Sequence, residues 1–212
     1  MKLSVLVLIL ILSVSIAAEL PSARTDCVRH SGDQFFFPLG VLGERTKQYD
    51  ADQVLRAWYS KHLLAMSEPS LSCKATADEA YRFLWLRTWG PPIAIRVERT
   101  GKDTNLSAVI LDGSGGYEPG AVSGRTKRKM NADEWKSVSD GLSRIDFWKL
   151  PGPVQLGGLD GAQWILEGRK GEQYHVVDRW SPETGAYREF CLSLVKIAGL
   201  LPSGKGKRDA IY

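Results

Sequence analysis

The feature that most constrains the fold is a series of three alternating segments between residues 81 and 112, separated by short turn signals. They are YRFLWLR at residues 81–87, IAIRVER at 93–99 and LSAVILD at 106–112, with WGPP and GKD between them. A period of two is typical of strands, and regular spacing with short turns favours an antiparallel meander. A shorter fourth strand is expected around residues 121–127.

Helical signals flank this meander. Asp50 is a good N-cap, and the apolar residues that follow recur at helical spacing until a stop before Pro69. Asn131 begins a second helix, with Glu134 in the capping-box position. We expect a third helix over residues 186–198.

Two further strands, at residues 161–167 and 173–180, form a predicted hairpin. The expected order is helix, four strands, helix, two strands, helix. This order predicts a single α+β domain over residues 49–201, with an antiparallel sheet of about six strands and helices packed on one face.

The ends of the chain are expected to lie outside this domain. Residues 18–48 form a predicted irregular arm that the rings of Phe35–Phe37 pin to the domain. Residues 202–212 are expected to be a basic, flexible tail.

Residues 1–17 have the layout of a secretory signal peptide, with Lys2, an apolar run and small residues up to Ala17. We expect cleavage after Ala17 and a secreted or periplasmic protein that meets the membrane only through this peptide. The rival interpretation is a retained anchor. It needs about 20 apolar residues, and the run from Leu3 to Ala18 is shorter.

Charge and motifs exclude several classes of function. The net charge is +4, and the basic clusters at residues 125–129 and 205–208 are interpreted as solvated segments, so no nucleic-acid partner is expected. The glycine-rich stretch at residues 112–120 lacks the Gly-Lys-Ser/Thr of a phosphate loop and is expected to be a bend. No Cys/His metal spacing occurs, so we expect neither a metal nor a cofactor.

Export permits a disulfide among the three cysteines. Cys191 lies on the predicted third helix, where a buried thiol behaves as a small apolar residue. We therefore predict a bridge between Cys27 and Cys73, which would tie the arm to the end of the first helix.

The hairpin contains the only weak candidates for catalysis, namely Glu167, His175 and Asp178. Glu167 or Asp178 would act as a base with His175 as its partner. An even-length turn separates His175 from both carboxylates, and an odd-length turn swaps the groupings. With an even turn, the two carboxylates share a face at opposite ends of the hairpin. We therefore favour a structural hairpin and lean against an enzyme.

A candidate binding surface follows from the strand at residues 81–87, which has rings and a guanidinium on one side and leucines on the other. If helices cover the aliphatic side, the aromatic side is either open or covered by the arm. An open side would suit flat or sugar-like ligands through stacking. The residues of this candidate surface are Trp85, Arg87, Trp164, His175 and Arg179.

Three stretches resemble an uncharacterised group of small exported bacterial proteins: YRFLWLR, GGYEPG at residues 115–120, and LDGAQWILEG with YHVVDRWSP between residues 159 and 182. The resemblance covers roughly residues 50–200. It implies a bacterial exported domain, and no activity or ligand comes with it.

These observations predict a non-catalytic binding or interaction module that uses the aromatic and arginine face. An exported protein or an envelope polymer is the candidate partner. One alternative is a hydrolase of an envelope polymer that uses Glu167, His175 and Asp178. A second alternative is an inhibitor or immunity-like protein for another exported enzyme.

Overall fold

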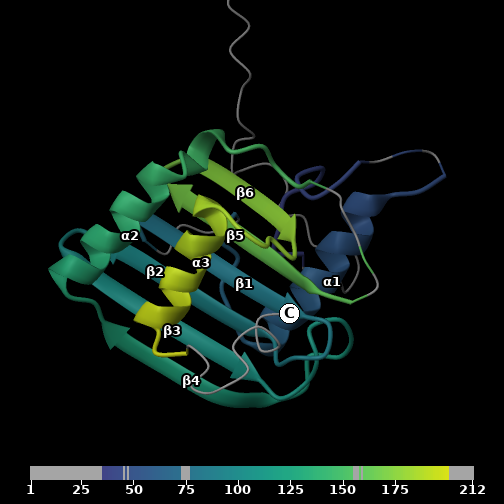
Figure 1. Cartoon of the computed structure of the whole chain (residues 1–212), viewed down its shortest axis with the longest axis horizontal. Helices are drawn as coiled ribbons and strands as arrows, with labels where there is room; N and C mark the ends of the chain where they lie inside the picture. The colour runs from purple at the N-terminus through teal and green to yellow at the C-terminus, as the bar shows by residue number, and fades with distance from the viewer. Residues whose placement is uncertain are drawn as a thin grey trace, which may run out of the picture.

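The computed structural model describes residues 35–44, 46, 48–72, 77–154, 158 and 160–200. In this part of the chain, six strands form one antiparallel sheet in the order β4-β3-β2-β1-β5-β6 (Figure 1). The strands are β1 (Glu79–Arg87), β2 (Ile93–Thr100), β3 (Asp103–Leu111), β4 (Val122–Lys129), β5 (Ala162–Lys170) and β6 (Gln173–Trp180).

Three α-helices and one 3-10 helix accompany the sheet. They are α1 (Ala51–Ala65), α2 (Ala132–Arg144), η1 (Phe147–Lys149) and α3 (Ala186–Ile197). The Asp50 side chain accepts a hydrogen bond from Gln53 N, and Asn131 forms a capping box with Glu134. The predicted caps, element order and α+β class are therefore confirmed.

The central strand β1 joins the two halves of the chain. Strands β1 to β4 form the expected meander, and α2 then returns the chain across the sheet so that β5 pairs with β1. Tyr81 lies opposite Gly168, and Trp85 lies opposite Trp164. The pairs between β1 and β5 thus join residues that are far apart in the sequence.

The helices lie on both faces of the sheet, so the prediction of helices on one face is wrong. Helices α2 and α3 cover the side of β1 with Tyr81, Phe83 and Trp85, whereas α1 covers the side with Leu84 and Leu86. In Figure 1, α3 lies in front of the strands and α1 behind them. Because both sides of β1 are apolar, each side requires its own covering layer.

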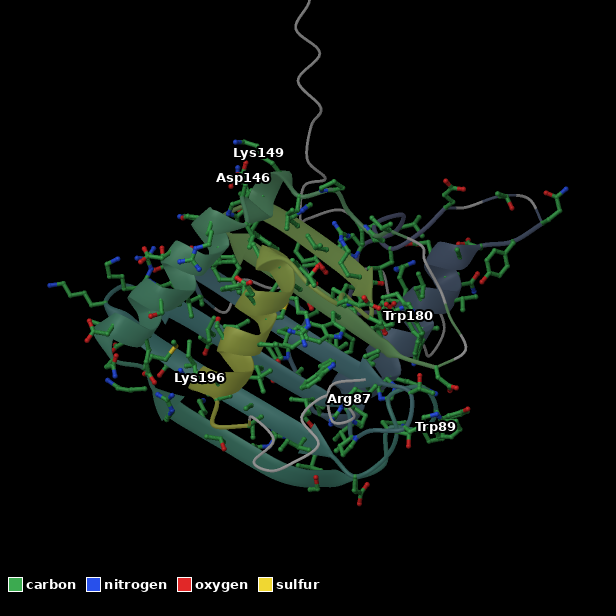
Figure 2. The ribbon with its side chains drawn as sticks, viewed as in Figure 1. Arg87, Trp89, Asp146, Lys149, Trp180 and Lys196 are labelled. Carbon is green, nitrogen blue, oxygen red and sulfur yellow. The ribbon has the colours of Figure 1, made fainter. Side chains whose placement is uncertain are left out.

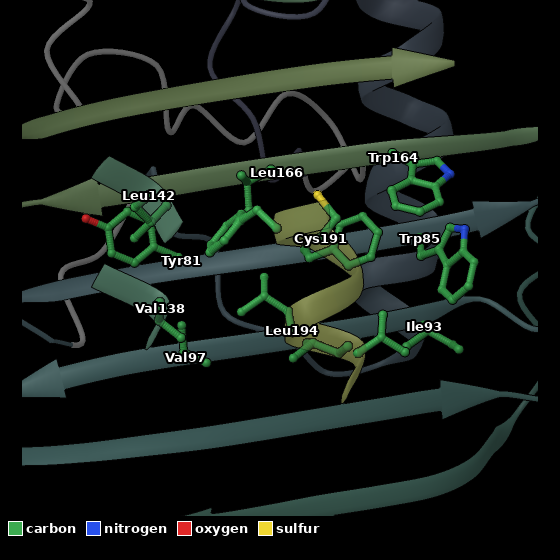
Figure 3. Close-up of a cluster of buried hydrophobic side chains, with 14 of the residues drawn as sticks. Tyr81, Trp85, Ile93, Val97, Val138, Leu142, Trp164, Leu166, Cys191 and Leu194 are labelled. Atoms are coloured by element: carbon green, nitrogen blue, oxygen red, sulfur yellow. The ribbon is translucent and has the colours of Figure 1, made fainter. Parts of the chain in front are cut away.

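The aromatic side of the sheet forms the larger of two cores (Figure 3). The rings of Trp85 and Trp164 lie 5.3 Å apart on neighbouring strands, and Phe83 packs against both. Cys191 and Leu194 of α3 cover these rings and are fully buried. The expectation that Cys191 serves as a buried apolar side chain is confirmed.

The second core lies under α1 and includes the arm. Phe36 and Phe37 are buried there, which confirms that rings pin the arm, although the arm covers the aliphatic side of β1 and not the aromatic side. A spacing of four residues places three polar side chains of α1 on one side of the helix, facing the arm. They bond its main chain: Asp52 accepts from Gly40 N and Leu42 N, Arg56 Nε donates to Phe37 O, and Ser60 Oγ accepts from Phe36 N.

Some predictions concern residues outside the described part of the chain. The signal peptide of residues 1–17, the Cys27–Cys73 bridge and the tail of residues 202–212 belong to this group and stay predictions. Among the described residues, no helix is long and apolar enough to cross a membrane.

A first prediction concerns Gly168 of β5, where the rings of η1 and β1 meet. A Cβ atom at Gly168 would lie 2.6 Å from ring atoms of both Phe147 and Tyr81. Because neither ring can move without disturbing the core, we expect Gly168→Ala to lower the free energy of unfolding by about 1–3 kcal/mol. Urea unfolding followed by tryptophan fluorescence measures this loss.

Gly124→Ala is the matched control, because Gly124 is also a strand glycine and its added Cβ would meet only the Ile110 side chain at 3.6 Å. We expect this variant to be unchanged or slightly more stable. An equal loss in both variants would contradict the packing argument.

Candidate functional site

The aromatic side of β1 is neither open nor covered by the arm, the two alternatives expected from the sequence. Trp85 and Trp164 are 1% and 0% exposed, because α2 and α3 cover the side of the sheet that bears them. Neither indole is available to stack on a ligand. Their rings contribute to the stability of the core and not to a surface.

Arg87 closes the end of this core. Its guanidinium lies 4.6 Å from the centre of the Trp85 ring, and Nη2 donates to Pro91 O at 3.2 Å. Burial lowers the pKa of Arg87. A Cβ atom at Gly90 would lie 2.7 Å from Arg87 Nε, so this glycine gives the arginine room to fold back over the indole.

His175 and Arg179 hold a loop against the edge strand β6. His175 Nε2 lies 3.0 Å from Leu150 O, and Arg179 Nη2 donates to Pro151 O at 2.8 Å. Arg179 Nη1 also donates to Gly152 O. Burial lowers the pKa of His175. Both side chains that were predicted to bind a ligand therefore attach the loop after η1 to the sheet.

The structure places the candidate catalytic residue His175 on the opposite side of the sheet from the two candidate carboxylates. Lys170 lies opposite Gln173, so the turn has an even number of residues and His175 points away from both carboxylates. Glu167 lies opposite Val176 and is a diagonal neighbour of Asp178 on the α1 side. The expectation that the carboxylates share a face is confirmed, but their placement at opposite ends of the hairpin is wrong.

Both carboxylates are buried beneath α1. Glu167 accepts hydrogen bonds from Arg82 Nε at 2.8 Å and from Tyr174 OH at 3.0 Å. Asp178 accepts one from Tyr59 OH at 2.6 Å. Burial raises the pKa of both, that of Asp178 to about 7. A substrate could reach neither group without displacing the helix, so these residues do not form a catalytic site.

A second prediction follows from the opposite effects of Asp178 and His62 on stability. Burial raises the pKa of Asp178 from 3.8 to about 7, so its contribution to stability falls as the pH rises from about 4 to 7. Burial lowers the pKa of His62 from 6.5 to about 4, so its contribution falls as the pH drops from 6.5 to 4. Between about pH 4 and pH 6.5, where both groups affect stability, the two effects therefore oppose each other.

Asp178→Asn removes only the first effect. We expect the free energy of unfolding of this variant, relative to the wild type, to increase by up to about 4 kcal/mol between pH 4 and pH 7.5, since each pKa unit corresponds to about 1.4 kcal/mol. His62→Gln should change in the reverse direction. Chemical denaturation at three pH values measures both. A difference that is the same at every pH would show that burial does not perturb these groups.

Two exposed aromatic side chains lie together at the loop end of the sheet, where β1 ends and β2 begins. Trp89 is 69% exposed and Tyr117 is 52% exposed, and their ring centres lie 5.2 Å apart. Figure 2 labels Trp89 at this end of the molecule. Trp89 Nε1 donates to Asp160 Oδ1 at 2.9 Å. The two rings are therefore exposed but fixed in position.

The glycine-rich stretch of residues 112–120 holds Tyr117 in place. Gly115 N donates to Gly90 O at 3.0 Å, and Gly116 N donates to Thr88 O at 3.3 Å. A Cβ atom at Gly115 would lie 2.6 Å from Leu86 Cα, so only glycine allows this loop to approach β1 so closely. The expectation of a bend in place of a phosphate loop is confirmed.

Helix α1 extends the same surface. Val54 and Leu64 are exposed, and together with Ala57, Trp58 and Lys61 they lie on the outer side of the helix at spacings of three and four residues. Trp58 Nε1 donates to Gly115 O at 2.8 Å, which joins α1 to the loop. A shallow pocket of about 400 Å³ lies at this junction, against Trp58, Lys61 and Gly116.

We call this area the α1–loop surface and define it by Val54, Ala57, Trp58, Leu64, Trp89 and Tyr117. Among its charged neighbours, Lys61 Nζ lies 3.2 Å from Glu118 Oε1, and the Asp160 carboxylate accepts the indole hydrogen bond of Trp89. The surface is therefore apolar and aromatic, with an ion pair and a carboxylate at its border.

The sequence interpretation overlooked this surface. It assigned WGPP and GGYEPG to turns and looked for binding residues on strands. Yet a large ring inside a turn has no strand face to direct it into a core, and Trp89 and Tyr117 both occupy such positions. The position of these large rings inside turns was thus the feature of the sequence that could have identified the surface.

Comparison with protein-family models and with curated protein sequences gives no match. Within the described ranges, no group of His, Cys, Asp and Glu side chains is arranged to hold a metal ion.

Proposed function

We propose that this protein is an exported, non-catalytic interaction module that binds a partner protein through the α1–loop surface. The observation that supports this most directly is the pair of exposed, fixed rings, Trp89 and Tyr117. Tryptophan and tyrosine are enriched among the residues that dominate binding energy at protein interfaces. Because the two rings are already held in place, binding costs little side-chain entropy.

The breadth of the surface favours a protein as the partner. Val54 and Leu64 of α1 add exposed aliphatic area to that of the rings, and large exposed apolar areas are uncommon on monomeric proteins. Asp160 accepts the hydrogen bond of the Trp89 indole, whereas Val54 and Leu64 offer a ligand no polar group. The surface is thus better suited to an apolar protein face than to a polymer of sugars.

The cellular location in this proposal depends on the signal peptide predicted at residues 1–17. If that peptide directs export, the partner is another exported protein. An inhibitor of an exported enzyme would be one form of such a module, and the identity of the captured partner would decide this.

A third prediction tests the surface. The mature chain, used to capture partners from an envelope extract of its host, should retain one specific protein, and the double variant Trp89→Ala/Tyr117→Ala should lose it. Loss of two central rings is expected to weaken binding at least about 30-fold, which titration calorimetry with the purified partner measures.

Tyr49→Ala is the matched control. Tyr49 is 62% exposed and precedes α1, but it lies outside the α1–loop surface. This variant should bind as the wild type does. A partner that binds the double variant as tightly as the wild type would refute the proposed surface.

A further inference from the structure

A second hollow lies at the other end of β1 from Trp89. Its volume is about 310 Å³, and it lies between the start of β1, the end of β5, α2 and η1. The side chains that matter here are Glu79, Tyr81, Ser143, Asp146, Trp148 and Lys170. Figure 2 labels Asp146 at the far end of the molecule from Trp89. This hollow, which we call the α2 pocket, takes no part in the α1–loop surface.

Aromatic rings form one wall of the α2 pocket. The ring centres of Tyr81 and Phe147 lie 5.7 Å apart, and those of Tyr81 and Trp148 lie 6.2 Å apart. These rings approach β5 closely because Gly168 has no side chain. Tyr81 and Phe147 are buried with their rings nearly perpendicular, so the partly buried Trp148 provides the face against which a ring-shaped ligand can pack.

Backbone geometry fixes this wall. Asp146 adopts φ 46° and ψ 51°, in the left-handed region that few residues other than glycine occupy. The chain turns at this residue, between the end of α2 and the start of η1. This turn places Phe147 and Trp148 over the sheet. Unfavourable backbone conformations of this kind tend to occur at binding sites.

The charged groups of the α2 pocket are paired with one another or with neighbours. Glu79 accepts from Tyr81 OH and from Arg99 Nη2, both at 2.6 Å, and lies 3.7 Å from Lys170 Nζ. Asp146 lies 3.1 Å from Lys149 Nζ. Because no charge in the α2 pocket lacks an opposite charge, a charged ligand would gain little there.

Polar atoms at the rim still suit hydroxyl groups. Glu79 and Asp146 are acceptors, the Lys170 ammonium is a donor, and the Ser143 hydroxyl can accept while it donates to Ser139 O. A mixture of donors and acceptors beside an aromatic wall matches a molecule with several hydroxyls. At about 310 Å³, the α2 pocket lies at the small end of ligand sites and suits one ring.

We infer that the α2 pocket binds a single neutral, hydroxyl-rich ring of pyranose size, packed against Trp148 with its hydroxyls toward Glu79, Ser143 and Lys170. This site is separate from the proposed protein interface and does not depend on it. The domain then has a sugar site at one end of β1 and a protein-binding surface at the other.

The test is a fourth prediction and uses N-acetylglucosamine and methyl glucoside as probes. Saturation-transfer NMR should detect at least one of them on the mature chain, and amide shifts should locate it near Ser139, Ser143 and the Trp148 indole. Ser143→Trp fills the α2 pocket from an exposed helix position and should weaken binding at least about tenfold. The absence of saturation transfer from both sugars would overturn the inference.

The matched control is Ser137→Trp, which places the same side chain on an exposed position of the same helix outside the α2 pocket. It should retain wild-type binding, and equal binding by the two tryptophan variants would contradict the site.

Glucuronate should bind more weakly than the neutral sugars, and tighter binding would contradict the inference that the α2 pocket prefers an uncharged ligand. If sugar binding is lost in Trp89→Ala/Tyr117→Ala instead, the sugar belongs to the α1–loop surface and the inference is wrong.

Discussion

The buried guanidinium of Arg82 is the interaction on which the rest of this fold depends. It is 0% exposed in the central strand, and it donates to Glu167 of β5 at 2.8 Å, to Glu68 after α1 at 3.2 Å and to Pro69 O at 2.6 Å. A buried charge without its partner costs several kcal/mol, so both carboxylates must be in place when β1 is covered. Burial lowers the pKa of Arg82, but Glu167 and Glu68 outweigh this effect and raise it. Arg82 therefore joins β1, β5 and the end of α1 in one arrangement.

Glu68 also offsets the repulsion between two like charges on neighbouring strands. Arg82 and Arg96 lie directly opposite each other on β1 and β2, a pairing that is unfavourable without an anion between them. Glu68 Oε2 accepts from Arg82 at 3.2 Å and from Arg96 at 2.9 Å. The segment after α1 is thus held to the centre of the sheet by charge, while apolar contacts hold the helix itself. This placement directs the outer side of α1 toward the loop that bears Tyr117.

The sequence predicted the local structure well but did not predict which helix covers which side of the sheet. Both outcomes have physical reasons. Caps such as Asp50 act within a few residues, and alternation fixes which side of β1 each residue occupies, so these features could be predicted. Both sides of β1 are apolar, however, and nothing in the alternation says which helix covers which side. Trp85 was therefore expected either on an open face or in a core beneath the arm, and it lies in a core beneath α2 and α3. The partners of Arg82 are 14 and 85 residues away along the chain, so no local pattern could identify Glu167 as a structural group.

The middle of the sheet is thus occupied by groups that stabilise the fold, and binding is left to its two ends. Strand β1 has nine residues, and at about 3.3 Å per residue it separates the α1–loop surface from the α2 pocket by about 30 Å. Coupling between two such sites requires an element that can adopt two alternative arrangements. Buried ion pairs and two cores hold the central strand β1 in a single arrangement. Binding at one end is then independent of binding at the other. If both proposals hold, the domain acts as a rigid spacer that keeps a partner protein at a constant distance from a sugar.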